Sequence, residues 1–276
     1  MAPTEQTSQE IHRRRVFYIP GYDPIHPRRY RELYRKESAD QAAITGYDIG
    51  LKPKTTKGPY GWHVRARIDG QDVATDIEVL VWSDIVRDSM SNSIPATYGQ
   101  LVRTAWEYIA TGALFRLMRL RKVPVIAALY PIAMLLLQLV IAGLVGWGVY
   151  ALAALAAPLF GLGAHVLGAV GSVAAAWAVL HWFKRRDGKV FAYYLMHDYA
   201  YSARFKGANP PELEARMAAF GAIIADALTG DVDEVLVVGH SSGAHLAVSI
   251  LADLIRAGRV PPTGPRLSFL SLGQVV

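Results

Sequence analysis

The sequence predicts an α/β protein with a mostly parallel sheet, helices on both faces of that sheet, and an inserted two-helix transmembrane hairpin. First, runs rich in Val and Ile alternate with longer helical runs, as in parallel sheets covered by helices. Second, residues 123–183 contain no Asp, Glu, Lys or Arg, whereas a membrane crossing needs only about 20 such residues. Third, the pentapeptide Gly-His-Ser-Ser-Gly at 239–243 separates a predicted strand from a predicted helix.

The composition indicates a protein that is partly embedded in a membrane. Of its 276 residues, 52% are apolar and only 19% are charged, which is apolar for a soluble chain. The net charge of +6 includes basic clusters on both sides of the apolar block, at 116–122 and 184–189. Because such juxtamembrane clusters attract anionic lipid, we expect the lipid bilayer as partner and no nucleic acid.

Several site classes are excluded or unsupported by the sequence. The chain has no cysteine, so neither a disulfide nor a thiolate metal site is possible. The histidines show no metal-ligand spacing, and the Gly-rich segment at 239–243 lacks the lysine of a phosphate-binding loop. We therefore expect neither a metal nor a cofactor.

The first part of the polar domain is predicted to occupy residues 1–122. A strand is expected at 16–20 (VFYIP) and ends in a Gly-Tyr-Asp-Pro turn. A charged helix follows at about 28–43, then a Pro-, Gly- and Lys-rich loop at 52–61. A second strand is expected at 77–82 (IEVLVW), because Val and Ile favour extended backbone.

An amphipathic helix is predicted at about residues 101–120, directly before the apolar block. Apolar residues recur there every four positions, while most of the charged residues lie elsewhere on the helix surface. Two alternatives remain open on periodicity alone. The helix lies on the membrane surface, or it packs on the sheet as a soluble helix.

Residues 123–183 are predicted to form the transmembrane hairpin, with its turn between Gly148 and Gly163. Pro131 is expected to kink the first crossing. The only ionisable residues in the block are His165 and His181, so the hairpin is interpreted as an anchor rather than a transport path. Small residues repeat at four-residue spacing in the second crossing and favour close helix packing; they are Ala164, Gly168 and Ser172.

The charges also predict the orientation in the membrane. Basic residues on both flanks favour a hairpin whose two ends stay on the cytoplasmic side of the inner membrane. The N-terminal segment MAPTEQTSQEIHRRR has no apolar run and is not a secretory signal. Both termini and the α/β domain are therefore expected in the cytoplasm.

The second part of the polar domain, residues 184–276, is expected to alternate between helices and strands. Helices are predicted at about 189–205, 211–228 and 244–257, and strands at 234–238 and 267–272.

The pentapeptide 239–243 matches the pattern G-x-S-x-G, with Ser241 at its centre. In a nucleophile elbow the serine lies on a strained strand-to-helix turn, so the residues two before and two after it must lack side chains. Gly239 and Gly243 meet that condition. The alternative interpretation is an ordinary turn between a strand and a helix.

With this motif in place, the chain resembles the α/β-hydrolase fold family of lipase and esterase type. The resemblance implies Ser241 as the nucleophile, Gly239 and Gly243 as elbow glycines, and the backbone N–H of Ser242 as one oxyanion donor. It implies Tyr22, after the first strand, as the second donor, although Pro20-Gly21 stands where many members have His-Gly. The implied activity is hydrolysis of a carboxylic or lipid ester.

The acid and the histidine of the triad depart from the family pattern. The family order is nucleophile, acid, histidine, but after Ser241 the chain has only His245 and then Asp253. Both lie in the helix after the elbow and are expected to be surface or packing residues. The acid and histidine are therefore expected beyond residue 276, and this form is expected to be nearly inactive.

Other candidate residues have simpler roles. His240 is expected to pack beside the site, and His197 and Asp198 are adjacent on a helix and face different ways. Asp23 and Asp84 follow predicted strand ends, where a site residue and a turn residue are both plausible. The alternative function is a non-catalytic, membrane-anchored scaffold or binding protein with a hydrolase-like domain.

Overall fold

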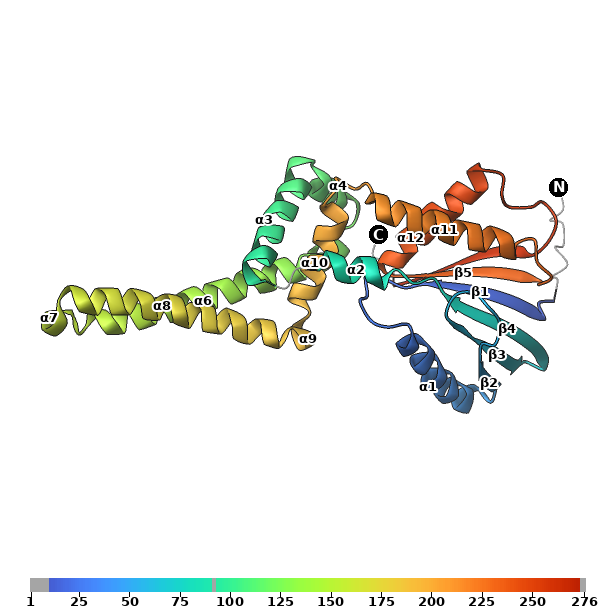
Figure 1. The fold of residues 1–276 in the computed structure, drawn as a ribbon, viewed down its shortest axis with the longest axis horizontal. Helices are drawn as coiled ribbons and strands as arrows, with labels where there is room; N and C mark the ends of the chain where they lie inside the picture. The colour runs from blue at the N-terminus through green and yellow to red at the C-terminus, as the bar shows by residue number, and fades with distance from the viewer. Residues whose placement is uncertain (1–9, 91–92, 274–276) are drawn as a thin grey trace. The chain divides into compact units, whose positions relative to one another are not determined.

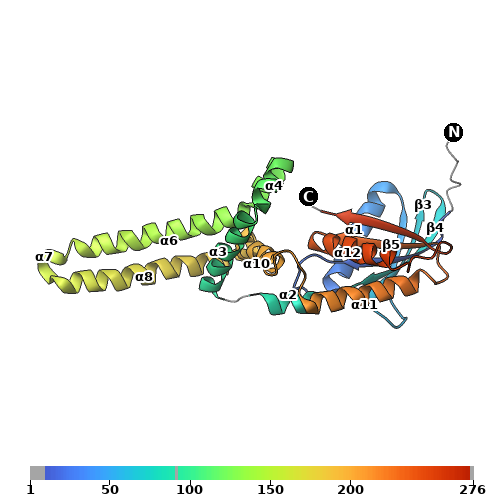
Figure 2. The ribbon, with the colours of Figure 1, turned by 90° about the horizontal axis from the view of Figure 1, so that it is seen from above.

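The computed structural model describes residues 10–90 and 93–273. The chain divides into two compact units, one made of residues 1–88 with 210–275 and the other of residues 89–209. The first unit contains the whole sheet, and the second contains the long apolar helices (Figures 1 and 2).

The α/β unit contains a six-stranded sheet in the order β2-β3-β4-β1-β5-β6. The pairs β4–β1, β1–β5 and β5–β6 are parallel, whereas β2–β3 and β3–β4 are antiparallel. The mostly parallel α/β fold is thus confirmed. Its strands are β1 (Arg13–Ile19), β2 (Asp48–Pro53), β3 (Gly61–Ile68), β4 (Gln71–Val79), β5 (Glu234–His240) and β6 (Arg266–Leu272).

Helices lie on both faces of this sheet (Figure 1). Val16 and Val238 point to one face, where tyrosines of α1 (Arg28–Thr45) join their cluster. Phe17 and Val237, one residue away along each strand, are fully buried on the other face, because successive side chains of a strand alternate. The remaining helices of this unit are α2 (Ser83–Ser89), α11 (Pro211–Ala227) and α12 (Ser242–Arg256).

The helical unit is built around a long antiparallel pair, α6 and α8 (Figure 2). Both helices are long and apolar enough to cross a membrane, with mean hydropathies of 2.2 and 1.6 over their best windows. Most of their apolar side chains are exposed. The helices are α3 (Ile94–Ala110), α4 (Ala113–Leu120), α5 (Lys122–Ala128), α6 (Tyr130–Ala154), α7 (Ala157–Phe160), α8 (Leu162–Arg185), α9 (Asp187–Val190) and α10 (Ala192–Ala203).

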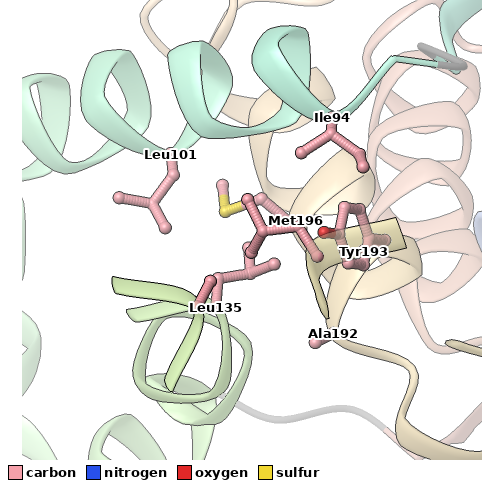
Figure 3. Close-up of a cluster of buried hydrophobic side chains, with 8 residues drawn as sticks. Ile94, Leu101, Leu135, Ala192, Tyr193 and Met196 are labelled. Atoms are coloured by element: carbon pink, nitrogen blue, oxygen red, sulfur yellow. The ribbon is translucent and has the colours of Figure 1, made fainter. Parts of the chain in front are cut away.

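Small residues allow α6 and α8 to approach closely, as the four-residue repeat predicts. A Cβ at Gly146 would lie 2.9 Å from the carbonyl oxygen of Ser172, and a Cβ at Gly168 would lie 2.8 Å from the Cβ of Ala153. At one end of this pair, α3 and α10 close an apolar cluster (Figure 3). Its buried members are Ile94, Leu101, Leu135, Ala142, Leu180, Ala192, Tyr193 and Met196.

Two sequence predictions for this unit were wrong in detail. The helix expected at 101–120 is two helices, because the chain is left-handed at Gly112, with φ of 69°, and α3 already begins at Ile94. The Ser93 side chain caps that earlier start by accepting a hydrogen bond from the Ala96 N–H. Pro131 lies in the first turn of α6 rather than in its interior, a position where proline is tolerated.

Candidate functional site

Ser241 lies between the end of β5 and the start of α12, in an unusual backbone conformation. Its φ is 53° and its ψ is −124°, a region that residues with a side chain rarely adopt. The residue is exposed. The predicted strand, turn and helix are therefore all present, and the turn is strained at its serine.

The two flanking glycines are required by close backbone packing. A Cβ at Gly239 would lie 2.5 Å from the Cα of Ala244 and 2.9 Å from the carbonyl oxygen of Gly243. A Cβ at Gly243 would overlap the carbonyl oxygens of Ile19 and Pro20. Neither position can hold a side chain without a shift of the backbone.

The loop after β1 passes directly beside Ser241. A Cβ at Gly21 would lie 3.1 Å from the Ser241 Cβ and 3.6 Å from its Oγ. The loop is held by Trp82, whose buried Nε1 donates to the Pro20 carbonyl at 2.8 Å. Tyr22, the next residue, is buried with its ring edge-on to Trp82. Its role as an oxyanion donor stays a prediction.

Backbone hydrogen bonds fix the elbow on its other side. The Ser241 N–H donates to the Leu272 carbonyl at 2.8 Å, which ties the turn to the last residue of β6. The Ala244 N–H donates to the Ser241 carbonyl at 2.9 Å. Ser242 begins α12, so its N–H lies at the positive end of the helix dipole.

Two aromatic rings and a carboxylate lie on one side of the elbow. His240 stacks on Tyr18, with 6.3 Å between ring centroids. Burial and, to a smaller extent, the negative charge of Asp23 together raise the pKa of the Tyr18 phenol to about 12. Asp23 accepts hydrogen bonds from the Tyr30 hydroxyl at 2.7 Å and from the Ile25 N–H at 2.9 Å, so it is a turn-forming residue.

The remaining candidate acids and bases are occupied elsewhere. Asp84 is held by Arg216 through two hydrogen bonds, at 3.0 and 2.6 Å, which lower the pKa of its carboxyl. Asp253 pairs with Arg256 on the exposed face of α12 at 3.1 Å. His245 is exposed on the same helix.

His197 belongs to the helical unit, where its Nδ1 lies 2.8 Å from the Gln100 Oε1. Within residues 10–90 and 93–273, no hydrogen bond joins the Ser241 hydroxyl to a histidine or a carboxylate. In the same part of the chain, no group of three His, Asp or Glu side chains could hold a metal ion.

One cavity was not predicted from the sequence. It has a volume of about 320 Å³ and lies in the helical unit between α3 and α10. Its residues recur at helical spacing on each helix, for example Gln100, Arg103 and Thr104 on α3. That spacing indicates that the residues share one face of their helix. The sequence near each segment does not show that two segments about 97 residues apart face each other.

Comparisons with protein-family models, with curated proteins and with solved structures find no significant match to this chain. A proposal for the function of this chain therefore rests on the geometry of Ser241 and its neighbours.

Proposed function

We propose that the chain is a membrane-anchored serine hydrolase in which Ser241 attacks the acyl carbon of a carboxylic or lipid ester. The observation that carries the proposal is the backbone of Ser241, with φ of 53° and ψ of −124° beneath an exposed side chain. Such a conformation costs about 1–3 kcal/mol and concentrates at functional sites. An ordinary strand-to-helix turn would not require it.

The surroundings of Ser241 suit stabilisation of an oxyanion. As the ester carbonyl is attacked, negative charge develops on its oxygen, and preorganised N–H groups stabilise that charge. Ser242 offers its N–H from the start of α12, where the helix dipole also favours an anion. The loop that carries Tyr22 packs against Ser241 through Gly21, which is the position that a second donor needs.

Ser241 also needs a general base, because a serine hydroxyl is a weak nucleophile at neutral pH. In the α/β-hydrolase order the acid and the histidine come after the elbow. The hydrogen bond from Ser241 to Leu272 brings the end of β6 to the elbow. A base that activates Ser241 would therefore have to reach its hydroxyl from the loops at this edge of the sheet.

The membrane part of the proposal rests on α6 and α8. Both helices would cross the bilayer as a hairpin with its tip at α7, and the basic residues at 116–122 and 184–189 would hold both ends on the cytoplasmic side. The catalytic unit would then act from the cytoplasmic face of the inner membrane. Esters that partition into that membrane would be the substrates nearest to the catalytic unit.

A second function is favoured by one observation. The Ser241 hydroxyl has no imidazole or carboxylate partner within the described residues, as expected of a non-catalytic scaffold that keeps a hydrolase-like fold. Such a protein would keep the elbow strain without the reactivity of an activated serine.

A fluorophosphonate probe distinguishes the two functions, because it reacts with serines that a base activates. The protein as its own cells produce it, in native membranes, is compared with its Ser241→Ala variant and with Ser249→Ala, a change at an exposed serine of α12. The hydrolase proposal requires labelling of the wild type and of Ser249→Ala, and none of Ser241→Ala. Labelling that survives Ser241→Ala, or a wild type that never reacts, would reject it and leave the scaffold.

A further inference from the structure

The residues that line the cavity all fall within residues 89–209, the range of the helical unit, and Ser89 among them is the last residue of α2. Its volume of about 320 Å³ is at the lower end of the range of small-ligand sites. Seven of the nine lining residues have polar side chains, and none of the nine is Asp or Glu. The lining residues are Ser89, Gln100, Arg103, Thr104, His197, Ala200, Tyr201, Ala203 and Arg204.

Two arginines give this cavity its charge. Arg103 lies in α3, and Arg204 is the C-cap residue that directly follows α10. Neither forms an ion pair with a carboxylate in the part of the chain that the structure describes. Arg204 lies beside the Phe205 ring, with its Cζ 5.4 Å from the centroid. Two cations that share a cavity without an acid create a positive potential there.

Two other lining residues, His197 and Gln100, form a part-buried polar contact. His197 is only 7% exposed, and its Nδ1 lies 2.8 Å from the Gln100 Oε1. This contact joins α10 to α3. The residues next to these two, Leu101 and Met196, are buried in the apolar cluster between the same helices (Figure 3). The polar groups are thus mounted on a packed helix pair and are held in place before a ligand arrives.

We propose that this cavity binds a phosphate group, either as a free phosphate ester or as the headgroup of an anionic lipid. The planar guanidinium forks of Arg103 and Arg204 match the oxygens of a phosphate and can bind them in pairs. Thr104 and Tyr201 add hydroxyl groups to the same lining. The proposal does not rest on the reactivity of Ser241 or on the fate of any ester.

The test uses the full chain purified in a zwitterionic detergent, with binding measured by titration calorimetry. One arm titrates inorganic phosphate and glycerol phosphate, and the other compares nanodiscs of phosphatidylcholine with nanodiscs that also contain phosphatidic acid. The variants are Arg103→Gln and Arg204→Gln, both at exposed positions, where a substitution usually changes stability by less than about 0.5 kcal/mol. The control is Arg259→Gln, which removes an exposed arginine that neither lines the cavity nor belongs to the basic clusters beside the apolar block.

Each cavity variant should weaken binding about tenfold or more, because a charge-assisted hydrogen bond is lost, whereas Arg259→Gln should not. Binding of soluble phosphates supports a free phosphate ester, and binding seen only with phosphatidic acid supports a lipid headgroup. The proposal is overturned when the wild type binds neither, or when Arg259→Gln weakens binding as much as Arg103→Gln does.

Discussion

Gly243 packs against Ile19 so closely that a side chain at Gly243 would collide with the Ile19 carbonyl oxygen. Gly243→Ala should therefore destabilise the α/β unit by about 1–3 kcal/mol, the usual cost of overpacking. It should also displace the start of α12, and with it the Ser242 N–H, and so reduce fluorophosphonate labelling. Thermal unfolding and labelling rate are the measurements.

The matched control for that change is Gly221→Ala in α11 of the same unit. A Cβ there would lie 3.7 Å from side-chain atoms of Ile250 and Leu254, which is an ordinary contact. Since alanine is favoured over glycine inside a helix, this variant should be stabilised by about 0.5–1 kcal/mol. Equal effects of the two alanines would mean that the elbow is not tightly packed.

The strain at Ser241 can be measured separately from its chemistry. Ser241→Gly removes both the Cβ and the hydroxyl, whereas Ser241→Ala removes only the hydroxyl. Because the φ of 53° is strained for any residue with a Cβ, the glycine variant should be the more stable of the two by about 1 kcal/mol after the larger backbone entropy of glycine is counted. Chemical denaturation compares them.

At Ser242, the next residue, we expect the opposite order of stability for the glycine and alanine variants. It is helical, so Ser242→Gly should be less stable than Ser242→Ala. If both positions rank their glycine and alanine variants in the same order, the backbone of Ser241 is not specially strained.

The pairing of Asp84 with Arg216 predicts a pH-dependent contribution to stability. Arg216 donates to both oxygens of Asp84 and to the Val81 carbonyl at 2.7 Å. The Arg216 side chain is 30% exposed and the Asp84 side chain is 51% exposed. Because the pair is partly solvated, Arg216→Met should cost only about 1 kcal/mol at neutral pH. Arg256→Met, whose partner Asp253 is 70% exposed, is the control and should change little.

The sign follows from the direction of the shift. The hydrogen bond from Arg216 lowers the pKa of the Asp84 carboxyl in the folded protein. The pair therefore stabilises the fold fully at pH values above the ordinary Asp pKa of about 4, and this stabilisation is lost as the pH falls through the lowered pKa of Asp84. The stability gap between the wild type and Arg216→Met should therefore narrow under acid. It should not vanish, because the hydrogen bond to Val81 does not titrate. A gap that is constant with pH would contradict the assignment.

The orientation of the hairpin can be tested with single cysteines, because the chain has none of its own. Leu159 in α7, between the two long helices, is 82% exposed. Ser202 in α10, which follows the second long helix in the sequence, is also exposed. In intact cells an impermeant maleimide should label Leu159→Cys but label Ser202→Cys only after the membrane is opened. The reverse pattern would place the α/β unit outside the cytoplasm.

Local patterns were sufficient to predict the elements that carry the elbow. The continuous apolar run before Gly239 marked β5, and the helical periodicity after Gly243 marked α12. The hairpin of β2 and β3 was missed, because these strands contain Pro53 and several cations and are only half-buried. Such strands are recognised by pairing with a partner rather than by their own composition.

Contacts between distant segments could not be predicted in the same way. Gly21 meets Ser241 because β1 and β5 pair in parallel, with Ile19 opposite Gly239, and a sequence does not state its register. The same holds for Arg103 and Arg204, which share a cavity only because α3 packs on α10. The strained turn at Ser241 can therefore be predicted from the sequence, whereas the distant residues that contact it cannot.

The close approach of α6 and α8 makes a final prediction about the hairpin. A Cβ at Gly168 would lie 2.8 Å from the Cβ of Ala153, whereas a Cβ at Gly163 would meet nothing within 4 Å. Leucine at either position is more apolar than glycine, so both variants should still insert into a membrane. Only Gly168→Leu forces the helices apart, and it should lose roughly 1–3 kcal/mol of stability. Thermal unfolding in detergent micelles, followed by circular dichroism, should therefore show a lower midpoint for Gly168→Leu and no loss for Gly163→Leu; equal midpoints would mean that the two helices do not pack through Gly168.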